Sequence, residues 1–263
     1  MNIIPAITVN NPYYKANVDK TSRYYSEFQK NGPRGLMLHS VGCPQPRAEV
    51  FVNTWNNSNA RVAVHAVLQA DGTVYQCLPW NYRGIHAGGK ANNTHIGVEM
   101  TEPDCIKYTK GSSFICSDVE KAKAQAVGTY NTAVELFAQL CNEFNLDPMT
   151  DIISHNEGYA QGVASNHGDP VHLWKQLGLG YTMDTFRKAV KTAVDARKAS
   201  FTVRVSITNL NIRKGPGWRK FAVVMVCPPG VYTISETKSA DGFTWGRLKS
   251  GAGWIALEYA TRL

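Results

Sequence analysis

The sequence lacks the apolar segments that would place it in a membrane. Its 263 residues contain no run that approaches roughly eighteen consecutive apolar residues, the length of a membrane-spanning helix. The opening stretch, MNIIPAITVNNPYYK, has no basic segment followed by a continuous apolar one, as a secretory signal would. We therefore expect no membrane span, and we expect synthesis in the cytoplasm without a signal peptide.

Paired cysteines are also missing. The six cysteines are scattered, and no two of them form a CxxC pair. This spacing excludes an ordinary zinc ribbon and gives no disulfide framework for a chain of this length.

Acidic residues are scarce near the end of the chain. Residues 200–263 hold nine Lys and Arg against three Asp and Glu, whereas residues 1–199 hold 19 against 17. All seven histidines lie before residue 173. The positive charge and the titratable chemistry are therefore expected in different parts of the chain.

The first part of the chain reads as alternating strands and helices. Strands are predicted at GLMLHS (35–40), HIGVEMT (95–101) and DIIS (151–154), and a hairpin with an Asp-Gly turn at 62–79. The segment 117–148 predicts a helix, with Ser117 and Glu120 in capping-box spacing. This order predicts an α/β domain with a mixed central sheet flanked by helices.

The end of the chain has a different character. The segment MDTFRKAVKTAVDARKAS predicts a basic amphipathic helix, and only short β-rich runs with glycine turns follow it. We expect a first domain over residues 1–182, a helical linker over 183–200 and a small all-β barrel over 201–263.

Three histidines are concentrated in the stretch ISHNEGYAQGVASNHGDPVHLW, residues 153–174. His155 ends one apolar run and His39 ends another, so the two converge if their strands are neighbours. A catalytic zinc ion needs three protein ligands and one open position. On spacing alone the third ligand could be Asp169, His167 or His172, and each histidine could instead be an ordinary core or surface residue.

Six pieces of the sequence, in order, resemble a known family. The pieces LMLHS, VHAVLQADGTVYQCLP, IHAGG, HIGVEM, SHNEG and NHGDP are similar to zinc-dependent N-acetylmuramoyl-L-alanine amidases of type 2. That family shares its fold with phage amidase lysozymes and animal peptidoglycan recognition proteins. The resemblance covers roughly residues 30–175. It implies a zinc ion bound by His39, His155 and Asp169.

The same resemblance suggests catalytic roles for two further residues. Glu99 matches a glutamate that acts as general base, although a lone strand glutamate is often only solvent-facing. His167 stands two residues before the third ligand, where the family commonly has a lysine that stabilises the oxyanion. The alternative, with His167 itself on the metal, stays open. Val64 occupies the position of a tyrosine that other members use, which leaves the role of base to Glu99.

Several other positions match the surroundings of the family's substrate cleft. The resemblance implies that His65 lines the substrate groove, and Trp80 and Asn93 are expected there from their position alone. It implies a mainly structural role for His86 and His172, and an orienting role for Glu157 beside His155.

The end of the chain resembles a bacterial SH3-like (SH3b) wall-targeting domain. The pieces VRVSITNLNIRKGPG and GWIALEYATRL carry this resemblance. The basic surface of such a domain suits anionic wall polymers. Nucleic acid is the alternative partner of a basic β-barrel. No aromatic RNA-binding run is present, so we expect no nucleic-acid binding.

Together these features predict a peptidoglycan hydrolase that cleaves the amide between N-acetylmuramic acid and L-alanine. A wall-targeting tail fits an endolysin of a phage or prophage, released onto the bacterial cell wall. Two alternatives are a non-catalytic peptidoglycan-binding protein on the same scaffold and a cytosolic amidase that recycles wall fragments. The sequence sets no oligomeric state.

Overall fold

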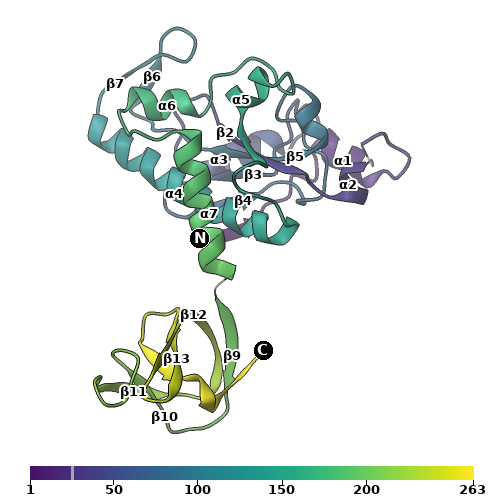
Figure 1. Ribbon diagram of the computed structural model, residues 1–263. Helices are drawn as coiled ribbons and strands as arrows, with labels where there is room; N and C mark the ends of the chain where they lie inside the picture. The colour runs from purple at the N-terminus through teal and green to yellow at the C-terminus, as the bar shows by residue number, and fades with distance from the viewer. Residues whose placement is uncertain (25–26, 199) are drawn as a thin grey trace. The chain divides into compact units, whose positions relative to one another are not determined.

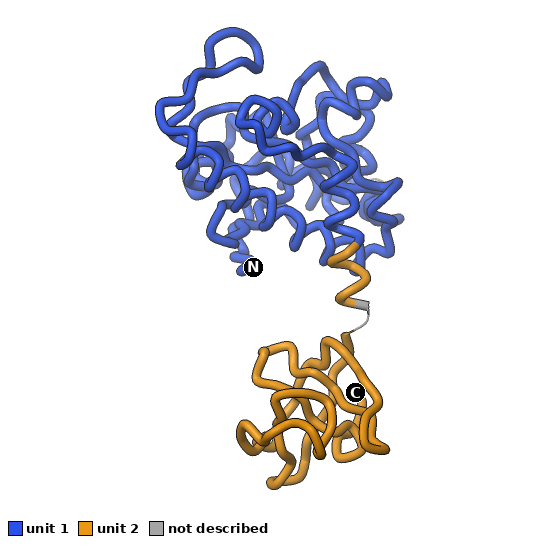
Figure 2. Tube along the Cα trace, turned by 60° about the vertical axis from the view of Figure 1, so that its left-hand side comes forward, with its two compact units in different colours: residues 1–191 blue, residues 192–263 orange. Residues whose placement is uncertain are grey.

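The computed structural model describes residues 1–24, 27–198 and 200–263. The chain divides into two compact units, residues 1–191 and 192–263 (Figure 2). The predicted domain boundaries at residues 182 and 200 remain predictions, and residue 199 of the predicted linker lies outside the described residues. Among the described residues, no helix has both the length and the apolar character that crossing a membrane requires.

The first unit is built on a six-stranded mixed sheet with the order β1-β4-β3-β5-β2-β8 (Figure 1). The β3–β4 pair is antiparallel, and the other four pairs are parallel. The strands are β1 (Asn2–Pro5), β2 (Gly35–Ser40), β3 (Ala66–Leu68), β4 (Thr73–Gln76), β5 (His95–Met100) and β8 (Ile152–Ser154). The predicted mixed sheet and the predicted hairpin are confirmed.

Helices surround this sheet. They are α1 (Pro12–Val18), α2 (Glu27–Asn31), α3 (Ala48–Trp55), α4 (Val119–Phe144), α5 (His155–Ala160), α6 (Val171–Gln176) and α7 (Met183–Lys198). A short 3-10 helix η1 (Lys90–Asn93) and a separate hairpin, β6 (Ile106–Tyr108) with β7 (Phe114–Cys116), complete the unit. The α/β fold class with a mixed sheet flanked by helices is therefore confirmed.

Helix α4, with 26 residues, is the longest described helix of the unit and packs against β3 and β5. Its N-cap is Asp118, whose side chain accepts a hydrogen bond from Lys121 N at 3.0 Å, and not Ser117 as the capping-box spacing predicted. Gly128 allows the close approach, because a Cβ there would lie 2.6 Å from that of Ala70. The helix ends at Asn145, which takes the left-handed conformation with φ 53°.

Central strands position the site. Every residue of β2 is buried, and its side chains alternate between the two faces of the sheet. Met37 and His39 therefore share one face, and Leu36 and Leu38 share the other. In the parallel β2–β5 ladder His39 lies directly opposite Glu99. On the other side of β2, Leu38 lies opposite Ser154, so that β8 delivers the next residue, His155, to the same sheet edge.

The second unit contains an antiparallel seven-stranded sheet with the order β11-β10-β14-β13-β12-β9-β15. Its elements are β9 (Phe201–Val205), β10 (Leu210–Arg213), β11 (Val223–Cys227), β12 (Gly230–Ala240), β13 (Phe243–Leu248), β14 (Trp254–Ala256), η2 (Leu257–Tyr259) and β15 (Ala260–Arg262). Val203, Ile212, Ile234 and Ile255 belong to its buried core. After the end of α7, the described part of this unit thus contains the small β structure that the predicted fold class includes.

Candidate active site

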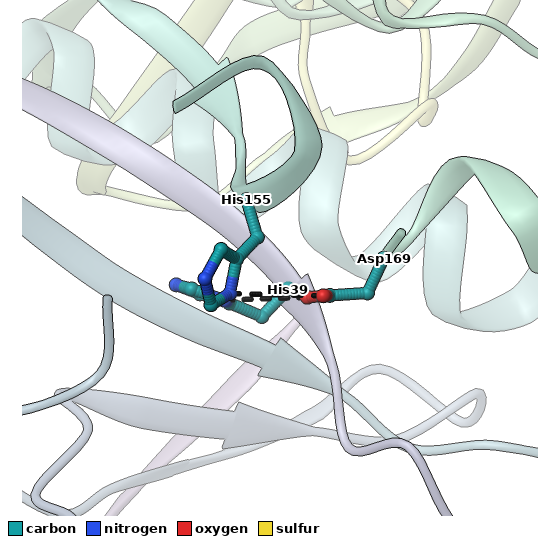
Figure 3. A group of neighbouring side chains, drawn as sticks. All are labelled: His39, His155 and Asp169. Atoms are coloured by element: carbon teal, nitrogen blue, oxygen red, sulfur yellow. Dashed lines mark hydrogen bonds and ion pairs between the residues drawn. The ribbon is translucent and has the colours of Figure 1, made fainter. Parts of the chain in front are cut away.

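Three buried side chains meet at the carboxyl ends of β2 and β8. His39 comes from β2, His155 is the first residue of α5, and Asp169 belongs to the loop before α6 (Figure 3). Their relative exposures are 1%, 5% and 9%. The two His Nδ1 atoms lie 3.0 Å apart, and the Asp169 carboxylate oxygens lie 3.3 Å from His39 Nδ1 and 3.6 Å from His155 Nδ1.

These separations fit a single small metal ion. Ligand atoms at about 2.0–2.1 Å from a tetrahedral zinc ion lie about 3.3 Å from one another. The three separations of 3.0, 3.3 and 3.6 Å in the structure bracket this value. Two imidazoles and one carboxylate are also a donor set that zinc prefers. The residues present therefore fit a zinc ion.

Hydrogen bonds set the tautomer of His39. The carbonyl oxygen of His95 accepts from His86 Nε2–H at 3.0 Å, which leaves His86 Nδ1 as an acceptor. His39 Nε2–H then donates to His86 Nδ1 at 2.9 Å. Burial holds the pKa of His86 well below its ordinary value, so this imidazole is neutral. The lone pair of His39 Nδ1 is consequently directed toward His155 and Asp169.

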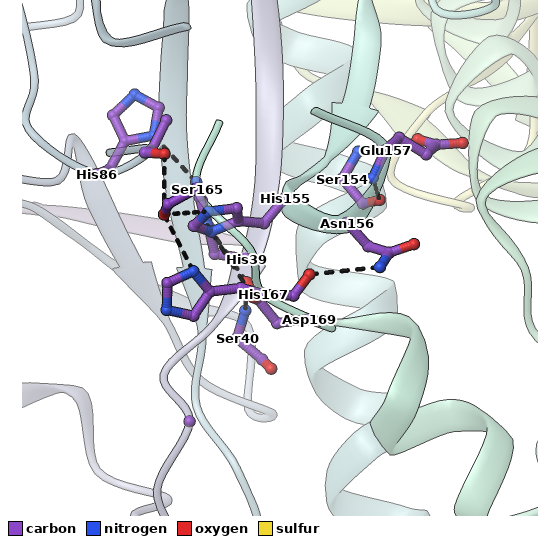
Figure 4. Close-up of polar contacts among 12 residues, drawn as sticks. His39, Ser40, His86, Ser154, His155, Asn156, Glu157, Ser165, His167 and Asp169 are labelled. Atoms are coloured by element: carbon purple, nitrogen blue, oxygen red, sulfur yellow. Dashed lines mark hydrogen bonds and ion pairs between the residues drawn. The ribbon is translucent and has the colours of Figure 1, made fainter. Parts of the chain in front are cut away.

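Ser165 sets the second ring in the same way (Figure 4). The Ser165 hydroxyl donates its proton to the carbonyl oxygen of Ala87 at 3.3 Å. Ser165 Oγ can therefore accept a hydrogen bond from His155 Nε2–H at 3.2 Å. His155 Nδ1 is then the free acceptor. Burial lowers the pKa of His155 to about 4. The hydrogen bonds of the two Nε2 atoms thus leave both Nδ1 atoms available to ligate a metal ion at one point.

Burial and neighbouring charges shift the pKa values of His39 and Asp169 in opposite directions. Burial acts to lower the pKa of His39, but the carboxylates of Glu99 and Asp169 outweigh it and raise this pKa overall. Burial acts to raise the pKa of Asp169, but its contacts with His39 and His155 lower it overall. Asp169 therefore remains ionised and supplies the negative charge that a divalent cation requires.

Glu99 lies beside this group, directly opposite His39 in the sheet. Its side chain is partly exposed, but its Oε2 atom is buried and has no hydrogen-bond partner among the described residues. Burial raises the pKa of this carboxyl to about 7. A carboxylate whose pKa lies near neutrality can both take and return a proton.

A cleft of about 850 Å³ opens over the group. Its lining includes all three metal-site candidates, Glu99 and His167. His167 is exposed, and its ring centroid lies 4.4 Å from that of His155. Its Nδ1 lies 3.1 Å from Ser165 Oγ. The structure thus groups Asp169 with the two histidines and places His167 on the cleft wall.

Other predicted site residues lie outside this cleft. His65 is completely buried, its Nε2–H donates to the carbonyl oxygen of Tyr82 at 2.7 Å, and its Nδ1 accepts from Gly97 N–H at 3.0 Å. It is a core residue rather than the groove-lining residue we expected. Trp80 and Asn93 are not among the residues that line the cleft. Their binding role remains a prediction.

A hydrogen-bonded network beside the cleft was not predicted from the sequence. Tyr108 donates its hydroxyl proton to Glu102 Oε2 at 2.8 Å and accepts from His172 Nε2–H at 2.7 Å. Glu102 is fully buried, and its Oε1 also accepts from Gly42 N–H at 3.2 Å. This hydrogen-bonded network holds the β6–β7 hairpin against α6, next to Asp169. No motif joins these residues, since they come from separate segments.

The chain was compared with known proteins. Residues 29–172 match the family model described as N-acetylmuramoyl-L-alanine amidase. No curated protein is significantly similar to the chain. Among solved structures, the Staphylococcus aureus hydrolase AmiA, crystallised with its ligand, is 16% identical with a TM-score of 0.56, covering 75% of this chain and 85% of that one. This likeness shows the fold.

Two further structures are more distant in shape. A mutant endolysin from Bacillus subtilis is 20% identical with a TM-score of 0.45, covering 72% of this chain and 99% of its own. The PlyG catalytic domain is 18% identical with a TM-score of 0.49, covering 74% of this chain and 96% of its own.

Proposed function

This chain belongs to the N-acetylmuramoyl-L-alanine amidase family, and on that premise we propose that it is a zinc-dependent hydrolase of bacterial peptidoglycan. The bond cleaved is the amide between N-acetylmuramic acid and L-alanine. One observation carries the proposal: the buried His39, His155 and Asp169 group opens onto the same cleft as Glu99, whose Oε2 atom has no hydrogen-bond partner among the described residues.

Zinc would be held by His39 Nδ1, His155 Nδ1 and the Asp169 carboxylate. When bound, it supplies the Lewis acidity that activates water and polarises the scissile carbonyl. His86 and Ser165 keep both imidazoles in the ligating tautomer through their hydrogen bonds.

The proton transfers fall to Glu99. Its free Oε2 takes a proton from the attacking water and then returns it to the amine of the leaving L-alanine. His167, on the cleft wall, donates a hydrogen bond to the amide oxygen as negative charge develops on it. An imidazole here replaces the lysine that the family commonly carries.

The second unit supports an endolysin-type role. Residues 200–263 carry nine Lys and Arg against three Asp and Glu, which suits attraction to anionic polymers of the wall. We infer that this unit is SH3-like and concentrates the catalytic unit on intact walls, so that the chain acts as a lytic enzyme after its release onto the wall.

End-group analysis of digested walls tests the proposal. Purified walls from several Gram-positive genera are incubated with the chain, and new termini are identified. The amidase activity predicts new N-terminal alanine and no new reducing sugar ends. New reducing ends without free alanine would contradict it. Cleavage confined to small soluble fragments would favour a recycling enzyme, and binding without any cleavage would favour a non-catalytic binder.

A further inference from the structure

An aromatic groove opens on the second unit, and none of the residues used in the proposed chemistry lines it. Its volume is about 470 Å³, and its walls come from β10, β13, η2 and the loop that carries Trp218. Trp218, Phe243, Trp245 and Tyr259 all line it, and none of the residues that line it is acidic. The groove therefore combines a broad stacking surface with an absence of negative charge.

Two of these aromatic side chains are too exposed to serve mainly as core. Trp218 is 49% exposed and Tyr259 is 51% exposed. Phe243 stacks on Tyr259 with ring centroids 6.1 Å apart and planes inclined by 26°. Exposed aromatic rings can stack on the apolar faces of sugar rings and bury apolar area. Because these aromatic side chains are already held in place, little conformational entropy is lost on binding.

The surface is held rigidly. Gly217 has φ +119°, and a Cβ there would lie 2.9 Å from Asp241 Oδ2. The same carboxylate oxygen accepts from Arg219 N–H at 2.9 Å, which fixes the loop on both sides of Trp218. Trp245 Nε1–H donates to the carbonyl oxygen of Ala240 at 3.0 Å. A ligand would thus meet a preorganised site.

Positive charge lies at the groove. Arg213 lines it and is the only charged side chain to do so among the residues that the structure describes. Its Nη1–H donates to the carbonyl oxygen of Phe221 at 2.9 Å, and the side chain is half-buried. The Arg219 guanidinium lies 5.0 Å from the Trp218 ring centroid. Guanidinium groups bind phosphate oxygens in a bidentate manner.

The three acidic side chains of residues 200–263 are engaged in other contacts. Glu258 accepts from Thr244 N–H at 2.6 Å, and Glu236 pairs with Lys238 at 2.8 Å. Asp241 holds the Trp218 loop as described above. Because no carboxylate competes inside the groove, its charge favours an anionic ligand.

We propose that this groove binds a sugar-bearing phosphodiester polymer of the bacterial wall, with a sugar ring on Trp218 and Tyr259 and a phosphate on Arg213. This assignment rests on the proposed function, because it supposes that the chain acts on walls. It goes further in naming the residues of the second unit that bind and the chemistry that they recognise.

Binding of the full chain to purified walls tests the assignment. Walls are used either intact or after hydrofluoric acid treatment, which removes phosphodiester polymers and leaves peptidoglycan. Trp218→Ala and Arg213→Gln should each weaken binding to intact walls about tenfold, since the loss of a stacking or phosphate contact has this size. Treated walls should bind the unaltered chain as weakly as intact walls bind the variants.

Matched controls separate the groove from general effects. Lys249→Gln removes an exposed charge and Val231→Ala an exposed apolar side chain of the same unit, and neither residue lines the groove. Both should bind intact walls normally. Arg213→Lys keeps the charge but loses the fork of donors, and it should bind less tightly than the unaltered chain.

Three results are decisive. Normal wall binding by Trp218→Ala and Arg213→Gln would overturn the groove assignment. Equal binding of the unaltered chain to intact and treated walls would overturn the phosphodiester ligand and indicate peptidoglycan instead. Cleavage of a soluble muramoyl peptide is measured in parallel. Its absence in the unaltered chain would contradict the amidase function, and the binding comparison would still decide the groove.

Discussion

Replacing Glu99 by glutamine separates catalysis from stability at the same carboxyl. The amide keeps the shape of the side chain but cannot take a proton. If Glu99 is the general base, the variant should retain one zinc ion per chain while its rate falls by about 100-fold or more. A variant that keeps its zinc and most of its activity would show that the base lies elsewhere.

The same substitution should lower the catalytic rate but increase the stability of the metal-free protein. Burial raises the pKa of Glu99 from 4.5 to about 7, so the ionised carboxylate destabilises the folded state. This cost is absent below pH 4.5, grows as the pH rises, and is complete above pH 7. At about 1.4 kcal/mol per pKa unit, the full cost is about 3 kcal/mol. Glutamine has no charge and avoids it.

Urea unfolding of chelator-treated protein measures this effect. The stability advantage of Glu99→Gln over the unaltered chain should widen by roughly 2–3 kcal/mol between pH 5 and pH 8. Glu143→Gln, on the exposed side of α4, is the matched control and should show no such widening. An advantage that stays constant or shrinks with rising pH would refute the burial of an ionisable Glu99.

Other substitutions address the neighbours of the proposed ion. His167→Ala should keep its zinc and lose about 3 kcal/mol of transition-state stabilisation, with partial recovery in His167→Lys; zinc loss would instead make His167 a ligand. His86→Ala removes the acceptor that sets the His39 tautomer and should weaken zinc binding by about 10- to 100-fold in a chelator competition, whereas unchanged affinity would contradict this positioning role. A chain ending at Ser200 should keep zinc and cleave soluble muramoyl peptides, yet bind intact walls less well; full wall binding would remove the targeting role of the second unit.

Much of the fold could be read from local patterns. The buried run of β2, the Asp-Gly hairpin and the long helix α4 each carry a strong periodic or turn signal, and each is present. The predicted start of α4 was wrong by one residue, because Ser117 and Asp118 are both residue types that cap helices. Backbone geometry selected Asp118, and the difference of one residue is not visible in spacing.

The site was only partly predictable for a different reason. His39 and His155 were identified because each ends an apolar run. Spacing left three residues open as the third ligand, and only the folded loop groups Asp169 with the histidines. His65 looked like a cleft residue, but backbone groups of Tyr82 and Gly97 satisfy both of its nitrogens inside the core. Such long-range partners leave no trace in a single sequence.

The most direct test of the central claim is the release of N-terminal alanine from purified walls by metal-free protein, before and after one equivalent of zinc is added. We predict no release before the addition and full activity after it. We also predict that His39→Ala stays inactive in both cases, because the site has lost a ligand. Full activity in the metal-free protein, or recovery of His39→Ala by the same single equivalent of zinc, would contradict a zinc centre built from His39, His155 and Asp169.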